Sequence, residues 1–393
     1  MNVSLIIGNE DVPASDGAIF ERRDPASGAL ASSAPAASVK DALKTADAAS
    51  AAFASWSSLG PTARRQLLLR GADMIEQRKA EFTTLMMAET GATAAWCAFN
   101  VRLGAGMMRE AAAMTTQITG EVIPSDQPGC LAFSVREPAG VVLAIAPWNA
   151  PVILGVRALA LPLACGNTVV LKSSESCPGT QYLLVSALRD AGFPAGVVNV
   201  ISTSAAQAGE IVASLIAHPA IRRINFTGST RVGRIVAKIA GRHLKPVLLE
   251  LGGKAPQIIL EDADLDAAVQ AAAFGAFMNQ GQICMSTERI VVRDEVADAF
   301  VKKFAEKTAT LRVGDSKIDG VAVGSMINAA SAERVDELVA EAVGKGANLI
   351  SGGTREGTIM SPTILDRVVQ SMRIYHEESF GPVASVVRVR SDD

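Results

Sequence analysis

Over the middle of the chain, short continuous apolar runs alternate with longer segments whose apolar residues recur at helical spacing. Such runs indicate buried strands, and the helical spacing indicates helices that pack on a sheet. Such runs at 141–146, 168–172 and 197–201 are predicted strands, and 221–226 is another predicted strand. The predicted helices are 152–163, 181–190, 205–217 and 229–240. This alternation predicts a parallel, doubly wound α/β sheet, whose ligand binds at the carboxyl ends of the strands.

The flanking segments predict further elements. Charged and apolar residues recur at helical spacing over 38–56 and 61–91, as on amphipathic surface helices. Residues 121–139 are interrupted by Pro and Gly around an apolar run, which predicts a hairpin. A second α/β unit is predicted to begin near Gly252. Its predicted strands and helices are 256–260, 265–277, 287–292, 296–310 and 330–344.

Composition narrows the class of protein. The 393 residues are 49% hydrophobic and 20% charged, with a net charge of −3, which is typical of a compact enzyme and excludes general disorder. Neither this charge nor the 4% aromatic content indicates nucleic-acid binding. The most hydrophobic region, 141–165, is interrupted by prolines and an arginine, so we expect a buried part of the fold and no membrane contact.

The cysteines and histidines predict a reducing location and no metal site. The five cysteines are scattered and odd in number, and residues 1–13 lack a signal-peptide core. We therefore expect a cytoplasmic protein. No cysteine cluster has zinc-ligand spacing, and the three histidines lie far apart in sequence.

A thiol and a carboxylate form the most informative pair of residues. Cys284 ends the segment Gly-Gln-Ile-Cys, and Glu250 lies 34 residues earlier in Leu-Glu-Leu-Gly-Gly-Lys. A thiolate can attack a carbonyl carbon, and a carboxylate can activate the water that later releases the acyl group. Taken alone, Cys284 is more typical of a buried structural cysteine, and Glu250 of an exposed strand end.

Asn149 is a candidate oxyanion donor. It lies in Pro-Trp-Asn-Ala-Pro, directly after a predicted buried strand. A fixed amide N–H can stabilise the oxygen that becomes negative when a thiolate adds to an aldehyde. The alternative is an asparagine in a proline-flanked turn, which is common.

These motifs, with Glu-Ser-Phe-Gly-Pro at 378–382, agree in order and spacing with one family. From about residue 20 onward the chain closely resembles the NAD(P)-dependent aldehyde dehydrogenase superfamily. The resemblance implies Cys284 as nucleophile, Asn149 and the Cys284 N–H as oxyanion donors, and Glu250 as the base that yields a free acid. A non-catalytic, crystallin-like relative is the rival class, and loss of Cys284 or Glu250 would have indicated it.

The resemblance also implies the fold and its domains. We expect an aldehyde dehydrogenase fold with a Rossmann-like NAD-binding domain at 1–119 and 140–251, an oligomerisation hairpin at 120–139 and an α/β catalytic domain at 252–393. Family members continue well beyond a motif like 378–382, so the catalytic domain is expected to be incomplete at its C-terminus. We expect a homo-oligomer, a dimer or tetramer, when the full C-terminus is present, and weak assembly and low activity for residues 1–393 alone.

Several residues are candidates for binding the cofactor. Glu175 follows a predicted strand, where a carboxylate can accept hydrogen bonds from the ribose 2′-hydroxyl and repel a 2′-phosphate, so it favours NAD. Gly228 and Ser229 open a predicted helix after a strand, as at a pyrophosphate site. The remaining cofactor residues implied by the resemblance are Lys172, Trp148, Glu378 and Phe380.

The substrate prediction is an aromatic aldehyde. The resemblance implies that the helix after Asn149 lines the substrate tunnel, so Ala150 and Arg157, a cation within this apolar helix, are predicted to contact the substrate. Trp96 is predicted to face the same tunnel. A structural salt bridge is an equal alternative for Arg157. The chain most resembles bacterial enzymes that oxidise salicylaldehyde to salicylate. Alternatives are benzaldehyde, vanillin and an aliphatic semialdehyde, the last of which usually requires a second cation.

Overall fold

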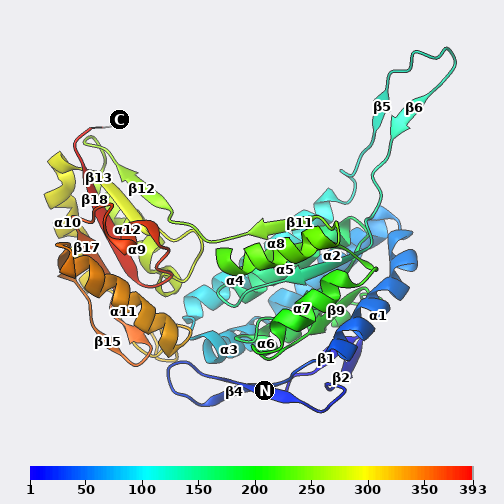
Figure 1. The fold of residues 1–393 in the computed structure, drawn as a ribbon, viewed down its shortest axis with the longest axis horizontal. Coiled ribbons are helices and arrows are strands. Elements are labelled where there is room, and N and C mark those ends of the chain that lie inside the picture. The colour runs from blue at the N-terminus through cyan, green and yellow to red at the C-terminus, as the bar shows by residue number, and fades with distance from the viewer. Residues whose placement is uncertain (392–393) are drawn as a thin grey trace. The chain divides into compact units, whose positions relative to one another are not determined.

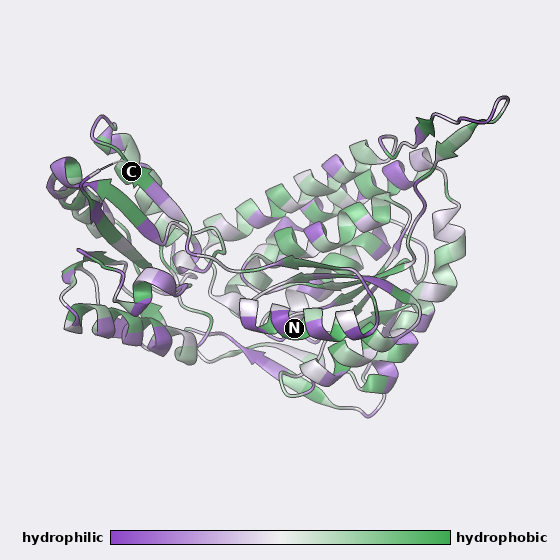
Figure 2. Cartoon of the chain, turned by 45° about the horizontal axis from the view of Figure 1, so that its top comes forward, coloured by the Kyte–Doolittle hydropathy of each residue, from purple (hydrophilic) through white to green (hydrophobic). Residues whose placement is uncertain are grey.

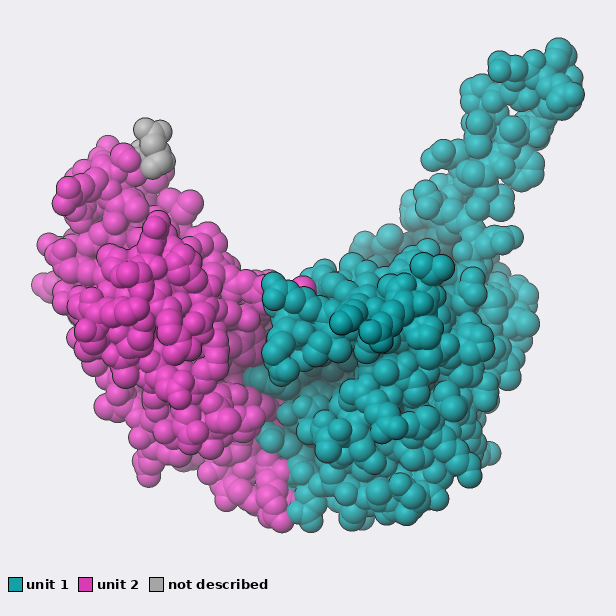
Figure 3. Space-filling model, in the orientation of Figure 1, with its two compact units in different colours: residues 1–22, 31–85, 98–250 teal, residues 23–30, 86–97, 251–393 magenta. Residues whose placement is uncertain are grey.

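In the computed structural model of the chain, residues 1–391 are described, and the chain divides into two compact units (Figure 3). Unit 1 comprises Met1–Arg22, Ala31–Leu85 and Ala98–Glu250. Unit 2 comprises Arg23–Leu30, Met86–Cys97 and the described residues from Leu251 onward. Within residues 1–391, each helix is too short or too polar to cross a membrane.

Two short N-terminal segments pack with unit 2, whereas the sequence placed all of residues 1–119 in the first domain. The Thr358 hydroxyl donates to the Pro25 carbonyl oxygen (2.7 Å), and the Gln280 side-chain amide donates to the Gly91 carbonyl oxygen (3.0 Å). Asp24 pairs with Lys317. These contacts join residues far apart in sequence, and the hydrophobic periodicity of the sequence cannot predict such contacts.

The sheet of unit 1 has the strand order β11-β10-β7-β8-β9-β1-β2, of which Figure 1 labels β11, β9, β1 and β2. Strands β7 to β11 are parallel, and β1 pairs antiparallel with both β9 and β2. The strands are β1 Leu5–Ile7, β2 Glu10–Val12, β7 Val141–Ile145, β8 Thr168–Lys172, β9 Val198–Ile201, β10 Ile221–Thr227 and β11 Val247–Glu250. The four strands predicted in this region are confirmed, and they form the centre of the sheet.

Helices form two groups against this sheet. Helix α1 packs on β8, β9 and α7, whereas α5 and α6 pack on each other and on α2. The helices begun in residues 1–250 are α1 Val39–Ser57, α2 Pro61–Gln77, α3 Lys79–Thr90, α4 Ala94–Met114, α5 Pro151–Ala164, α6 Pro178–Asp190, α7 Ala208–Ala217 and α8 Thr230–Arg242. The amphipathic segment 61–91 is two helices, because the backbone leaves the helical region at Arg78 (φ −89°, ψ 17°).

Two hairpins lie outside the main sheet of unit 1. Strands β5 (Glu121–Ile123) and β6 (Ala132–Ser134) pair antiparallel, which confirms the predicted hairpin. It exposes the side chains of Val122, Ile123, Leu131, Phe133 and Val135. Strands β3 (Ile19–Arg23) and β4 (Leu30–Pro35) form a separate two-stranded sheet. The role of the β5–β6 hairpin in assembly stays a prediction.

The sheet of unit 2 has the order β12-β13-β18-β17-β14, and only β14 pairs antiparallel among these described strands. Its strands and the small pair beside it are β12 Pro256–Ile259, β13 Arg289–Arg293, β14 Asn348–Ser351, β15 Arg355–Glu356, β16 Ile359–Met360, β17 Thr363–Asp366 and β18 Val383–Val389. Its helices are α9 Leu265–Phe277, the 3₁₀ turn η1 Met278–Gly281, α10 Asp294–Ala309, α11 Ala329–Gly344 and α12 Arg373–His376.

Buried apolar residues pack on both faces of this second sheet, and the green segments of its strands in Figure 2 are hydrophobic residues. Ala384 and Val386 of β18 join one cluster, with Phe300 and Phe304 of α10, whereas Val383 joins the other with residues of α11. Successive side chains of a strand point to opposite faces, so a strand buried on both sides carries a continuous apolar run.

The chain reverses sharply between α9 and β13. Asn279, Gln280 and Gly281 are left-handed in succession, with φ of 49°, 57° and 68°. The left-handed region is unfavourable for residues with a β-carbon and persists only where surrounding structure enforces it. Here the Gln280 amide donates to the carbonyl oxygens of Gly91 (3.0 Å) and Ser325 (2.9 Å). A β-carbon at Gly281 would lie 2.1 Å from the Gly381 carbonyl oxygen.

We expect Gly281→Ala to lower stability by on the order of 3 kcal/mol, because it adds left-handed strain to a backbone clash. The measurement is the midpoint of thermal unfolding, which should fall by several degrees. Gly344→Ala is the control: this helical glycine has open space around its β-carbon position, so its midpoint should hold or rise slightly. Equal midpoints for both variants would show that the 279–281 turn tolerates a side chain.

Candidate active site

The polar residues of unit 1 gather after its parallel strands. Asn149 follows β7, Glu175 follows β8, Ser229 follows β10, and Glu250 ends β11. Parallel neighbours end at the same edge of a sheet, which is where ligands bind in doubly wound folds. The structure therefore places the predicted oxyanion, cofactor and base residues of this unit at one edge.

Asn149 is held in a buried segment at the start of α5. Its side chain is buried, Ala150 caps the helix, and Pro151 occupies the first helical turn, where proline is favoured. The segment is fixed by Gln181 of α6, whose amide N–H donates to the Pro147 carbonyl oxygen (3.1 Å). Gln181 was not predicted from the sequence as a site residue.

The same glutamine reaches the loop after β8. Its side-chain oxygen accepts a hydrogen bond from the Ser174 N–H (2.7 Å). Gln181 therefore ties the loop that carries Trp148 and Asn149 to the loop that carries Glu175. The sequence gives no signal for Gln181, because a glutamine in a helix is ordinarily an exposed polar residue.

Lys172 and Glu175 form an ion pair with an Nζ to Oε2 distance of 3.6 Å. The lysine is buried, and this desolvation lowers its pKa, while the charge of Glu175 opposes the shift. Glu175 keeps 42% of its side chain exposed, so its carboxylate remains accessible to a ligand hydroxyl.

The turn after β10 opens α8. The Gly228 N–H donates to the Glu250 carbonyl oxygen (3.0 Å), which joins the turn to the end of β11. The Ser229 side chain caps the helix by accepting from the Val232 N–H (3.4 Å). A β-carbon at Gly228 would lie 2.7 Å from the Phe226 ring, so a side chain at this position would displace that ring.

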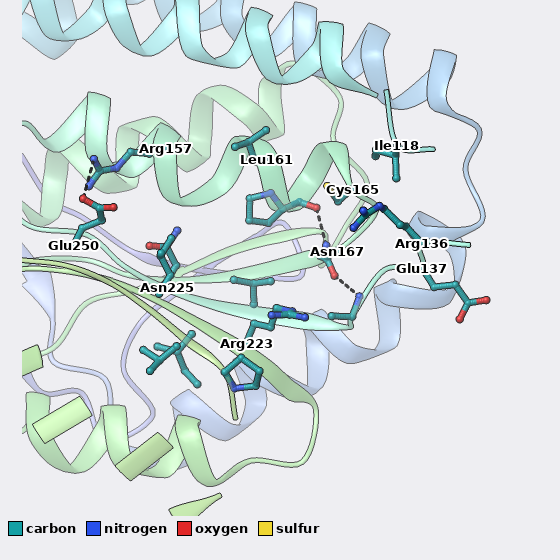
Figure 4. Close-up of a pocket in the computed structure, with 17 residues that line it drawn as sticks. Ile118, Arg136, Glu137, Arg157, Leu161, Cys165, Asn167, Arg223, Asn225 and Glu250 are labelled. Atoms are coloured by element: carbon teal, nitrogen blue, oxygen red, sulfur yellow. Dashed lines mark hydrogen bonds and ion pairs between the residues drawn. The ribbon is translucent and has the colours of Figure 1, made fainter. Parts of the chain in front are cut away.

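Arg157 and Glu250 line one cavity of unit 1, with a volume of about 910 Å³ (Figure 4). The Arg157 guanidinium donates to the Thr227 hydroxyl (3.0 Å), and its Nη1 lies 3.9 Å from the Glu250 carboxylate. The predicted salt bridge of Arg157 is therefore present, and its partner is the predicted base. Arg136 and Arg223 also line the cavity, whereas Asn149 and Ala150 are not among its described lining residues.

Cys284 belongs to unit 2 and follows the left-handed turn 279–281. Its position is fixed by hydrogen bonds on both sides: the Ser286 hydroxyl donates to the Gly281 carbonyl oxygen (3.1 Å), and the Ile327 N–H donates to the Gln282 side chain (2.9 Å). By contrast, burial raises the pKa of Cys97 to about 12 and also raises that of Cys165. Those two thiols are poor nucleophiles near neutral pH.

Glu378 and Phe380 lie in the loop before β18. The Glu378 carboxylate packs against Gly252, where a β-carbon would lie 2.1 Å from Oε2. Burial and then the neighbouring charge of Glu288 raise the pKa of Glu378. Its Oε1 is buried and has no hydrogen-bond partner among residues 1–391, so it can accept a hydrogen bond from a ligand hydroxyl. Phe380 is left-handed, with φ of 50°.

Trp96, a predicted substrate residue, belongs to unit 2 and is 5% exposed. Arg157, Ala150, Asn149 and Glu250 belong to unit 1. Among residues 1–391 there is no cluster of three or more His, Cys, Asp or Glu side chains that could hold a metal ion.

Comparison with known proteins agrees with these motifs. Residues 12–393 match the aldehyde dehydrogenase family. The chain is 56% identical to a vanillin dehydrogenase of Pseudomonas fluorescens and 48% identical to a salicylaldehyde dehydrogenase of Pseudomonas putida, in each case over 100% of this chain and 81% of the relative.

One solved structure is similar to this chain in both sequence and fold. The crystal structure of a salicylaldehyde dehydrogenase from Pseudomonas putida G7, complexed with salicylaldehyde, superimposes with a TM-score of 0.98 and 48% identity. The superposition covers 100% of this chain and 81% of the chain in that structure. This similarity confirms the predicted fold. The chain belongs to the aldehyde dehydrogenase family and is an oxidoreductase that acts on aldehydes.

Proposed function

We propose that this protein oxidises a hydroxylated aromatic aldehyde to the carboxylate with NAD. The observation that carries the proposal is the cavity of unit 1, in which the Arg157 cation lies beside the Glu250 carboxylate among apolar residues. A phenolic oxygen can accept a hydrogen bond from a guanidinium, and an apolar wall suits an aromatic ring.

Three residues carry the proposed chemistry. The Cys284 thiolate attacks the aldehyde carbon, and the Asn149 side-chain amide donates to the oxygen that becomes negative. Loss of hydride from this adduct leaves an acyl thioester on Cys284. Glu250 then takes a proton from water, whose oxygen attacks the thioester and releases the carboxylate and the thiol.

The chain offers residues that fit a dinucleotide cofactor. When bound, its nicotinamide supplies the acceptor for the hydride. The unpartnered Oε1 of Glu378 fits a ribose hydroxyl, and Phe380 lies two residues further along the loop. Lys172 ends a strand of the doubly wound sheet, and Glu175 and the Gly228–Ser229 turn follow strands, as residues for the adenosine half do. The carboxylate of Glu175 favours NAD over NADP, since it would repel a 2′-phosphate.

Vanillin and salicylaldehyde are the two leading substrates. The sequence resemblance favoured salicylaldehyde, whereas the vanillin dehydrogenase of Pseudomonas fluorescens is more similar, at 56% against 48%. We therefore place vanillin first. Arg136 and Arg223 also line the cavity, and this observation keeps an aliphatic semialdehyde as the alternative, since its distal carboxylate would bind a second cation. Figure 4 shows Arg136 at the opposite end of the cavity from Arg157.

The first test is NADH formation with vanillin, salicylaldehyde, benzaldehyde, succinic semialdehyde and acetaldehyde. We expect the hydroxylated aromatic aldehydes to give the highest kcat/KM. Cys284→Ala should abolish turnover, and Asn149→Ala should lower kcat by roughly 10²–10³-fold. Glu250→Gln should release one equivalent of NADH and then stall at the thioester. The control, Cys130→Ala, alters an exposed thiol and should keep full activity; a Cys284→Ala enzyme that still turns over would disprove the mechanism.

A second prediction concerns Arg157. If its guanidinium donates to the phenolic oxygen of the substrate, Arg157→Met should raise KM for vanillin and salicylaldehyde by about tenfold or more. This is the contribution of a hydrogen bond from a charged group. Benzaldehyde has no phenolic oxygen, so its KM should change less. Arg136→Met, at the other end of the cavity, is the matched control. If KM changed equally for all three aldehydes in Arg157→Met, Arg157 would have no direct contact with the substrate hydroxyl. Its role would then be limited to its contacts with Thr227 and Glu250.

A third prediction follows from the raised pKa of Glu378. Protonation removes the charge that would accept a ribose hydroxyl, so NAD affinity should decline as the pH falls, beginning above the ordinary glutamate pKa of 4.5. Because the pKa is raised in the folded protein, ionisation of Glu378 destabilises the folded state. The protein therefore loses stability as the pH rises through the folded pKa. Glu378→Gln should therefore melt no lower than wild type at pH 7 while binding NAD weakly at every pH. Titration of NAD binding and thermal melts from pH 4 to 8 provide the check; a pH-independent wild-type affinity would contradict it.

A further inference from the structure

Glu288 is a buried carboxylate to which the proposed chemistry gives no role. It lies immediately before β13 and is 2% exposed. Burial of a charge is costly unless partners compensate it, so its partners indicate what the carboxylate does. Those partners come from two other loops of unit 2.

The first partner loop carries the candidate ribose ligand. The Ser379 N–H donates to Glu288 Oε2 (2.7 Å), and the Phe380 N–H donates to Oε1 (3.1 Å). Both oxygens of one carboxylate therefore bind consecutive backbone N–H groups. Hydrogen bonds of this kind, to a charged acceptor, are stronger than those between neutral groups.

These bonds hold a strained backbone. Phe380 is left-handed, a conformation that a bulky residue adopts only when its surroundings impose it. Arg334 binds the same loop from its carbonyl side, with bonds to the oxygens of Glu378 (2.8 Å) and Ser379 (3.2 Å). The loop is thus held through its N–H groups by Glu288 and through its carbonyl groups by Arg334.

The second partner is Lys254, whose Nζ lies 2.7 Å from Glu288 Oε2. Both side chains are nearly inaccessible, at 7% and 3% exposed. Burial lowers the pKa of Lys254, and the charge of Glu288 opposes that shift. Gly252, two residues before Lys254, is the residue against which the Glu378 carboxylate packs. Glu288 therefore joins the loop beneath Glu378 to the loop that carries Glu378.

We propose that Glu288 is a positioning residue for the cofactor: it fixes the Glu378–Phe380 loop so that the Glu378 carboxylate is presented to the ribose hydroxyls. The proposal rests on the proposed function, because it takes Glu378 as a cofactor ligand. Glu288 itself touches neither substrate nor cofactor. It acts by supplying the acceptors that a left-handed Phe380 requires.

The test is Glu288→Gln in the full chain. Glutamine has the same shape but only one accepting oxygen, so one of the two N–H groups loses its partner and Lys254 loses its counter-charge. We expect Kd and KM for NAD to rise about tenfold or more, as for one unsatisfied buried donor. The KM for the aldehyde should change little. Hydrogen exchange at the Ser379 and Phe380 amides should become faster.

Two further variants separate positioning from general stability. Asp366→Asn removes the carboxylate of another buried ion pair of unit 2, Asp366–Arg388 at 2.7 Å, and should lower the melting temperature without raising KM for NAD. Because Glu288→Gln leaves an unpaired buried lysine, it can fail to fold. The double variant Lys254→Met with Glu288→Gln leaves neither charge unpaired and should show the same NAD defect.

Each outcome decides a separate point. Wild-type NAD affinity in a folded Glu288→Gln protein or in the double variant, or equal rises in KM for NAD and aldehyde, would overturn the positioning role. Unchanged exchange at Ser379 and Phe380 would overturn it independently of any activity. A wild-type protein that binds no dinucleotide would instead overturn the proposed function, and the exchange measurement would still report whether Glu288 fixes the loop.

Discussion

The geometry of unit 2 depends on the close approach of two backbone segments. The turn 279–281 leads into Cys284, and Gly381 ends the loop that carries Glu378; the two meet so closely that no side chain fits at Gly281. Hydrogen bonds from Gln280 and to Glu288 then hold the left-handed residues on each side. The candidate nucleophile and the candidate ribose ligand are thus set by main-chain packing, which is stiffer than contact between flexible side chains.

The sequence predicted the parts of the fold that carry a strong local signal. Strands β7 to β9 are fully or mainly apolar and appear where expected, because buried parallel strands need no polar face. Strand β10 also appears where expected, although it carries two arginines. The short strands β1, β2 and β11 were not predicted, since each has too few residues to show a period. The break at Arg78 also left no signal, because it contains neither glycine nor proline.

The candidate site was predictable to the same extent. Cys284, Glu250 and Asn149 stand in distinctive strings, so spacing and resemblance were enough to single them out. Gln181 lies in no such string, and Glu288, although it lies within the distinctive string 281–289, received no role from it. The importance of the two residues comes from partners 34 and 91 residues away. Arg157 shows the opposite limit: a lone cation in an apolar helix predicted either a substrate contact or a salt bridge, and only the fold identified Glu250 as its neighbour.

The pair Lys254 and Glu288 has a consequence for how this protein can change. Either charge alone would remain buried without compensation, so each single replacement passes through a less stable intermediate. Evolution or directed mutagenesis should therefore cross this position in a double step, or by way of a compensating change elsewhere. Libraries that aim to alter the cofactor loop one residue at a time will undersample it, because the viable combinations are epistatic.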